Sequence, residues 1–293
     1  MKNYAAAAIL ICALMLLLTA CGHGAEDGET PPPQEEPADY SAISYAPEGK
    51  IEGSTLYAKK VEGLPDDFIM GMDVSSVISL EESGVKYYDF EGRQQDLFIT
   101  LAENGITHIR VRVWNDPFDA EGNSYGGGGN SPERAVEIAK RARDAGLKLI
   151  VDFHYSDFWA DPGKQMVPKA WKDMSIDEKD TALYSFTCDT LKSIADTGVT
   201  VAMVSIGNET NQYLCGEKGW TNITRLMRSG AKAVRDTLPE ALVAIHFANP
   251  ENADAYASYA SKLAYYSLDY DIFATSYYPY WHGTLENLKT VLG

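Results

Sequence analysis

The chain has 293 residues, of which 45% are hydrophobic and 23% are charged, as is ordinary for a folded globular protein. Its formal net charge of −17 argues against a nucleic-acid partner, because phosphate binding requires clustered Lys and Arg side chains. The same charge argues against charge-driven docking to anionic lipid. The length suits one large domain or two small ones.

The first 20 residues have the pattern of a secretory signal peptide, with one lysine before a short apolar run. The run ends in LTAC at 18–21, which resembles a bacterial lipobox whose cleavage leaves Cys21 as a lipidated first residue. An incidental cysteine or an uncleaved anchor helix is the alternative, but the run is short for a bilayer span. We therefore expect a lipoprotein at the extracellular face of the cell membrane, or a secreted protein.

Residues 21–64 are rich in Gly, Pro and Glu near their start, and we expect a disordered tether and N-terminal extension there. The folded domain is expected over 65–293. It contains Cys188 and Cys215, for which buried free thiols are favoured over a bridge, although spacing leaves their pairing open.

Short apolar runs alternate with amphipathic segments along this domain. Strands are predicted at 68–73, 108–114, 148–154, 201–207, 242–247 and 271–278. Helices are predicted at 93–104, 132–145, 177–197, 221–238, 253–264 and 284–292. The runs are nearly all apolar, which is typical of strands covered on both faces in a parallel sheet. A glycine ends three of the helices, which indicates successive units wound the same way (Gly105, Gly146 and Gly198).

Two α/β architectures fit this alternation, an open doubly wound sheet and a (β/α)8 TIM barrel. No glycine-rich phosphate turn follows the first strand. The GGGG sequence at 126–129 follows a loop and lacks an attached Gly-Lys-Ser/Thr, so it predicts a flexible loop. We therefore predict the barrel, with about six of its eight strand–helix units in this chain.

Polar and aromatic residues follow each predicted strand. The main ones are Asp73, Arg110, Arg112, Trp114, Asp152, His154, Trp159, Asn208, Glu209, His246, Tyr277, Tyr278, Tyr280 and Trp281. Aromatic faces beside carboxylates and amides are what sugar rings require. The sequence GxSxG is absent, so esterase chemistry has little support.

Two details of this set leave room for other interpretations. His154 with its neighbouring aspartates has the composition of a metal cluster, but the spacing matches no standard ligand motif, so we expect neither metal nor cofactor. Arg110 and Arg112 share one strand face and, if buried, each needs an acidic partner. We expect one of them to orient a catalytic carboxylate.

The sequences GMDVSS, GITHIRVRVWNDP, DFHYSDFWADP, SIGNE and SYYPYW resemble, in order and strand position, glycoside hydrolase family 53, the endo-β-1,4-galactanases. The resemblance runs from about Phe68 to the end of the chain. It implies a (β/α)8 enzyme that hydrolyses β-1,4-galactan, as in type I arabinogalactan, with retention of configuration and without a cofactor.

The resemblance also implies roles for single residues. Glu209 becomes the general acid/base, and Asn208 beside it binds the 2-hydroxyl of the sugar at the cleavage point. Tyr278, or alternatively Tyr277, hydrogen-bonds the nucleophile. The remaining residues line the cleft: Asp73, Arg110, His154, Trp159 and His246. Partial burial and the charge of a nucleophile about 5–5.5 Å away are expected to raise the pKa of Glu209.

The family's nucleophile is a glutamate at the end of a seventh strand, whereas this sequence ends at Gly293 within the sixth helix. Glu286 lies in that helix and is a poor substitute. We expect a C-terminally truncated chain that lacks the nucleophile. Loops that might hold a calcium ion would lie past residue 293, so the sequence does not indicate whether calcium is bound. Its unpaired sheet edges predict poor solubility or partial unfolding, and no activity. A complete chain is expected to be a monomer.

Two other functions remain open from the sequence. One is a different enzyme of the same clan, such as a β-mannanase or a cellulase. The other is a non-catalytic glycan-binding surface lipoprotein, which keeps the aromatic residues and does not need Glu209. A two-lobed transporter-type binding lipoprotein has little support, because nothing in the sequence marks a hinge.

Overall fold

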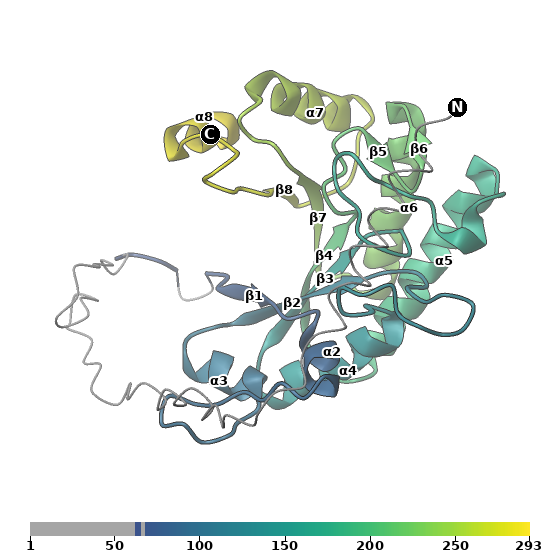
Figure 1. The fold of residues 1–293 in the computed structure, drawn as a ribbon. Helices are drawn as coiled ribbons and strands as arrows, with labels where there is room; N and C mark the ends of the chain where they lie inside the picture. The colour runs from purple at the N-terminus through teal and green to yellow at the C-terminus, as the bar shows by residue number, and fades with distance from the viewer. Residues whose placement is uncertain (1–61, 66–67) are drawn as a thin grey trace, which may run out of the picture. The chain divides into compact units, whose positions relative to one another are not determined.

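A six-stranded parallel sheet forms the centre of the computed structural model, which describes residues 62–65 and 68–293 (Figure 1). Its strands are β1 (Gly71–Asp73), β2 (His108–Val113), β3 (Lys148–Phe153), β4 (Val201–Ile206), β7 (Leu242–Phe247) and β8 (Ile272–Thr275). They lie in that order, and each neighbouring pair is parallel. The expected signal peptide, Cys21 and nearly all of the tether lie outside the described residues.

Helices follow the strands in alternation. They are α2 (Val77–Glu82), α3 (Leu97–Glu103), α4 (Pro132–Asp144), α5 (Ile176–Ala195), α6 (Trp220–Thr237), α7 (Ala253–Tyr265) and α8 (Leu285–Leu292). A hairpin of β5 (Tyr213–Leu214) and β6 (Glu217–Lys218) lies between β4 and α6. Because strand order in the sheet equals chain order, the helices from α2 to α7 lie in connections between neighbouring strands, which is the arrangement of a partial (β/α)8 barrel.

The six expected strands and six expected helices are confirmed, and local chemistry explains their boundaries. Ser131 caps α4 ahead of Pro132, and Ser175 forms a capping box with Glu178 at the start of α5. The three expected glycines after helices all have positive φ, at Gly105, Gly146 and Gly198. The short helix α2 and the β5–β6 hairpin were not predicted, since neither has a long periodic pattern.

The two faces of the sheet differ, which corrects the expectation that both are covered. On β2, Ile109, Val111 and Val113 are at most 1% exposed and belong to the core shared with the helices. Helices α4, α5 and α6 lie along this face (Figure 1). On the opposite face the described residues leave apolar side chains accessible, and Leu242 there is 38% exposed. One face of the sheet is therefore packed against helices, and the other is partly accessible at its apolar positions.

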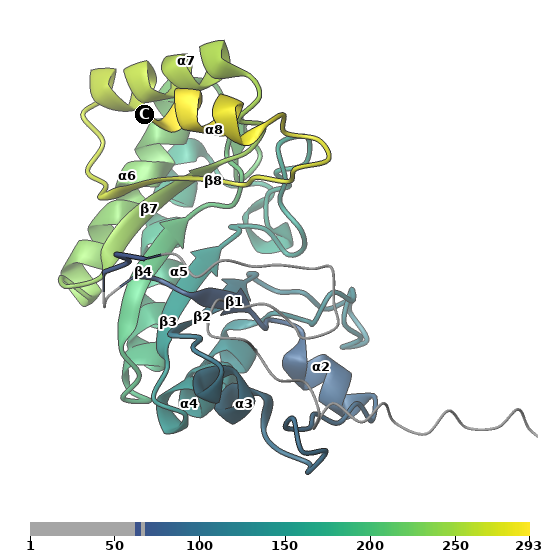
Figure 2. The ribbon, with the colours of Figure 1, turned by 90° about the vertical axis from the view of Figure 1, so that its left-hand side faces the viewer.

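The sheet runs from β1 at one end to β8 at the other (Figure 2). Cys188 and Cys215 are both buried and free, as favoured from the sequence. In the part of the chain that the structure describes, no helix is long and apolar enough to cross a membrane.

The difference between the two faces predicts a contrast within β7. Ile245, which is 1% exposed and faces the helices, should lose about 2–4 kcal/mol of unfolding free energy on substitution by alanine, because a cavity remains. Leu242→Ala, on the accessible face, should cost less than about 1 kcal/mol. Urea unfolding of both variants measures the contrast, and equal losses would show that the two faces are assigned wrongly.

Candidate active site

A pocket of about 490 Å³ lies at the carboxyl ends of the parallel strands. In parallel βα folds these ends meet at one edge of the sheet, where active sites are built. The side chains that line the pocket come from the ends of five segments far apart in the sequence: Arg110, Trp159, Ala160, Asp161, Asn208, Glu209, His246, Ser276 and Tyr278.

Glu209 is held in the pocket by an abrupt turn after β4. Its backbone has φ of 50°, a left-handed conformation that is uncommon for a residue with a side chain. Gly207, two residues earlier, has φ of 122°, and a Cβ there would lie 2.5 Å from Cγ2 of Thr210. The Thr210 amide donates to the carbonyl of His246, which fixes the turn against β7. The turn thus requires glycine at 207.

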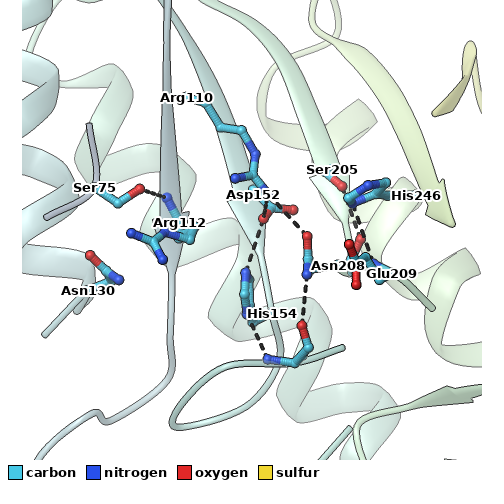
Figure 3. A network of polar contacts seen from close by, with 12 residues as sticks. Ser75, Arg110, Arg112, Asn130, Asp152, His154, Ser205, Asn208, Glu209 and His246 are labelled. Carbon is cyan, nitrogen blue, oxygen red and sulfur yellow. Dashed lines mark hydrogen bonds and ion pairs between the residues drawn. The ribbon is translucent and has the colours of Figure 1, made fainter. Parts of the chain in front are cut away.

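A directional chain of hydrogen bonds ends on Glu209. The Glu209 amide donates to Nδ1 of His246 over 3.4 Å, so the neutral ring carries its proton on Nε2. Nε2 lies 2.9 Å from Oγ of Ser276, and Ser276 donates to Oε1 of Glu209 over 2.5 Å. Burial lowers the pKa of His246 to about 4, so the ring is neutral near neutral pH. Figure 3 shows His246 beside Glu209.

The pKa of Glu209 is raised above its ordinary value. Burial is the largest cause, and the negative charges of Asp161 and Asp152 add to it. The hydrogen bond from Ser276 acts in the opposite direction, because it stabilises the ionised carboxylate. A carboxyl group that retains its proton toward neutral pH can act as a general acid.

Arg110, on β2, is the residue through which the neighbouring strands are connected at the pocket, and Figure 3 shows it beside Asp152. Its Nη1 lies 2.5 Å from Oδ2 of Asp73, and its Nη2 lies 2.5 Å from Oδ2 of Asp152 and 3.1 Å from Oδ1 of Asn208. The expectation that one of the arginines orients a catalytic carboxylate stays a prediction. Arg110 pairs with two supporting aspartates, and it reaches Glu209 only through the neighbouring Asn208.

Asp152 is fully buried, and its pKa nevertheless lies well below the usual range. Burial alone would raise this pKa, but the charge of Arg110 and the contact with His154 outweigh it. His154 is itself fully buried, accepts from the Ala160 amide at Nδ1, and lies 3.2 Å from Asp152 through Nε2. Asp152 is therefore a permanent buried anion at the base of the site.

Trp159 presents an aromatic face at the edge of the pocket. The side chain is 41% exposed and packs edge-on against Trp114, with 5.6 Å between ring centroids. The guanidinium carbon of Arg112 lies 4.1 Å from the centroid of the Trp159 ring. Arg112 is buried, and this burial lowers its pKa. Such a supported ring is suited to stacking on the apolar face of a sugar.

The eight residues to which the resemblance gives roles fall into two groups. Six of them line the pocket: Arg110, Trp159, Asn208, Glu209, His246 and Tyr278. Asp73 and His154 lie one contact further back, against Arg110 and Asp152 respectively. Tyr278 is 50% exposed, and its amide donates to Nδ1 of His282.

Sequence reasoning missed Ser276, which contacts Glu209 directly. Asn208 is also more constrained than expected, because Nδ2 donates to the carbonyl of Ala160 and its own carbonyl accepts from Gln165. Within residues 62–65 and 68–293, no group of three or more His, Cys, Asp or Glu side chains is arranged to hold a metal ion.

The site thus combines a parallel sheet of βα units with a glutamate of raised pKa after its fourth strand, an adjoining asparagine and an exposed aromatic ring. The sequence profile of glycosyl hydrolase family 53 matches residues 69–293. The chain belongs to this family, as its motifs indicated.

Known relatives agree with this assignment. The chain is 51% identical over 243 residues to the endo-β-1,4-galactanase of Bacillus subtilis (strain 168), a match covering 83% of this chain and 57% of that protein. It is 36% identical to the arabinogalactan endo-β-1,4-galactanase of Humicola insolens, covering 76% and 68% of the two chains. The solved catalytic domain of the same family from Ignisphaera aggregans matches with a TM-score of 0.75 and 41% identity, over 79% of this chain and 65% of that one. The chain thus spans little more than half the length of the Bacillus relative.

The hydrogen bond from Ser276 predicts a pKa change. Ser276→Ala removes a donor that stabilises the ionised form of Glu209, so the pKa of Glu209 should rise further. A carbon-13 NMR titration of the Glu209 carboxyl group measures this. Ser193→Ala, which alters a hydroxyl on the exposed side of α5, is the matched control. An unchanged or lowered pKa would contradict the arrangement.

Proposed function

We propose that this chain supplies Glu209 as the general acid/base for retaining endo-hydrolysis of β-1,4-galactan, including type I arabinogalactan. The observation that carries the proposal is the Glu209 carboxyl group, which faces the pocket at the end of β4 with a raised pKa. Membership of the family and 51% identity to an endo-β-1,4-galactanase support galactan as the substrate.

In the proposed reaction Glu209 first donates its proton to the glycosidic oxygen while a carboxylate nucleophile attacks C1 of the sugar. It then removes a proton from the water that attacks the glycosyl–enzyme intermediate. Trp159 stacks on a sugar ring, Asn208 binds the 2-hydroxyl at the cleavage point, and Tyr278 supports the nucleophile. Arg110 and His246 hold these groups in place.

We further propose that the described residues do not supply the nucleophile. Retention requires a second carboxyl group about 5–5.5 Å from the acid/base. Among the described residues, Asp161 is the other carboxylate that lines the pocket, and its Oδ1 accepts from the Gly163 amide within its own loop. By itself this chain should therefore bind galactan oligosaccharides without cleaving them.

A small external nucleophile tests this proposal. With β-1,4-galactotetraose and sodium azide, azide should form a bond to C1 as the C1–O bond breaks, and Glu209 should protonate the departing sugar. Mass spectrometry should detect galactosyl azide products only when azide is present. Glu209→Gln should reduce their formation about 100-fold or more, because it removes the proton donor.

The other outcomes separate the alternatives. Galactan hydrolysis without azide, abolished by Asp161→Asn, would contradict the missing nucleophile and leave the galactanase assignment intact. Binding of galactotetraose with no azide product would favour the non-catalytic glycan-binding alternative. Products from mannan or cellulose oligosaccharides, and none from galactan, would favour another clan member.

We also propose that the protein is anchored by lipid at Cys21 on the extracellular face of the membrane, with its polysaccharide substrate outside the cell. The support is the LTAC sequence at 18–21 after a short apolar run. In a bacterial host grown with labelled fatty acid, the chain should become labelled and sediment with membranes. Cys21→Ser should remove both properties, and labelling that survives this substitution would contradict the anchor.

A further inference from the structure

A second pocket of about 400 Å³ is lined by residues of the β5–β6 hairpin, the start of α6 and helix α7. None of its residues lines the Glu209 pocket. Its lining consists of aromatic, amide and lysine side chains with small residues between them: Gln212, Tyr213, Lys218, Gly219, Trp220, Ala255, Ser258, Tyr259 and Lys262. Its volume falls in the range of small-molecule sites.

Two lysines give this pocket a positive charge. Nζ of Lys218 lies 5.5 Å from the ring centroid of Tyr213, and Nζ of Lys262 lies 4.8 Å from that of Trp220. The lining contains no carboxylate. Among the described residues, neither Lys218 nor Lys262 forms an ion pair. Glu217, beside the pocket, is paired with Lys179 at 2.6 Å. In a chain of net charge −17 this is a local cationic site.

The aromatic floor of the pocket is fixed by packing. The rings of Trp220 and Tyr259 have centroids 5.9 Å apart, and Tyr259 is nearly buried and stacks on Phe247 at 4.5 Å. Each cation–aromatic contact limits where an ammonium group can move. The two ammonium groups and the aromatic side chains therefore line the same pocket in fixed positions.

A third pocket, of about 360 Å³, adjoins this cationic pocket. The two pockets share Gln212, Tyr213, Ala255 and Tyr259. The third pocket adds the polar side chains of Asn249, Glu251 and Asn252, which suit sugar hydroxyl groups. Asn211 also lines it, but its side chain is hydrogen-bonded to the backbone of Ala248. The pocket also includes Pro162, next to Asp161 of the Glu209 pocket. The third pocket therefore extends the cationic pocket toward the loop that carries Asp161.

We propose that the cationic pocket of Lys218 and Lys262 binds a carboxylate-bearing sugar, a hexuronate unit of an acidic polysaccharide. The lysines pair with the carboxylate, the aromatic side chains contact the ring, and the adjoining amides bind hydroxyl groups. A free phosphate would use only the ammonium groups and would leave the aromatic and amide surfaces without a role.

Calorimetric titration with trigalacturonate at low ionic strength tests the proposal. Lys218→Gln and Lys262→Gln should each raise Kd about fivefold, and the double variant should raise it about 20-fold. Lys232→Gln is the matched control, because Lys232 also lies over a ring, 5.2 Å from the centroid of Tyr184, but pairs with Asp236 outside the pocket. Its Kd should stay within about twofold of the unmodified chain.

Three results would overturn the proposal. In the first, the double variant binds trigalacturonate as tightly as the Lys232→Gln control. In the second, neutral β-1,4-galactotriose binds equally well and is lost in the same variants, which would remove the need for a carboxylate. In the third, inorganic phosphate displaces trigalacturonate at equal concentration, which would leave an anion site without sugar recognition. The readout is binding, so the absence of galactan hydrolysis does not affect the test.

Discussion

The buried carboxylate of Asp152 requires a cation, and Arg110 on the neighbouring strand supplies it. The parallel register places Asp73 directly beside Arg110 across β1 and β2, so one guanidinium is shared by three strands. Removing one partner of a buried ion pair leaves an uncompensated charge and costs about 3–5 kcal/mol. The same guanidinium binds Asn208, and this contact fixes the residue that precedes Glu209.

Around this ion pair the pKa values of two carboxyl groups shift in opposite directions. Asp152 is fully buried but paired with Arg110, and its pKa falls, whereas Glu209 is half-buried without a cationic partner in direct contact, and its pKa rises. His246 is neutral near neutral pH, so it provides a hydrogen bond without a charge that would favour ionised Glu209. Divergent carboxyl pKa values within one site are the pattern by which acid and base roles are separated.

Signals within a few residues of one another could be read from the sequence, including the Ser131-Pro132 cap of α4 and the apolar strand that ends at Glu209. Features that depend on which strands lie side by side, and in which register, could not be predicted from the sequence. Ser276 carries no local signal, and its role arises only because β8 lies beside β7. The partners of Arg110 depend on which strand ends lie opposite it. Leu242 lies in an apolar stretch of sequence, which predicts burial, but its side chain is 38% exposed. The sequence does not show this, because burial depends on which elements cover the sheet.

The central claim is that the Arg110–Asp152 pair determines the geometry of the site, and a double-mutant cycle tests it most directly. Unfolding free energies are measured for the unmodified chain, Arg110→Gln, Asp152→Asn and the double variant. The account predicts that Arg110→Gln costs about 3 kcal/mol or more, and that the double variant costs no more than this single substitution. Two small losses that simply add would contradict it.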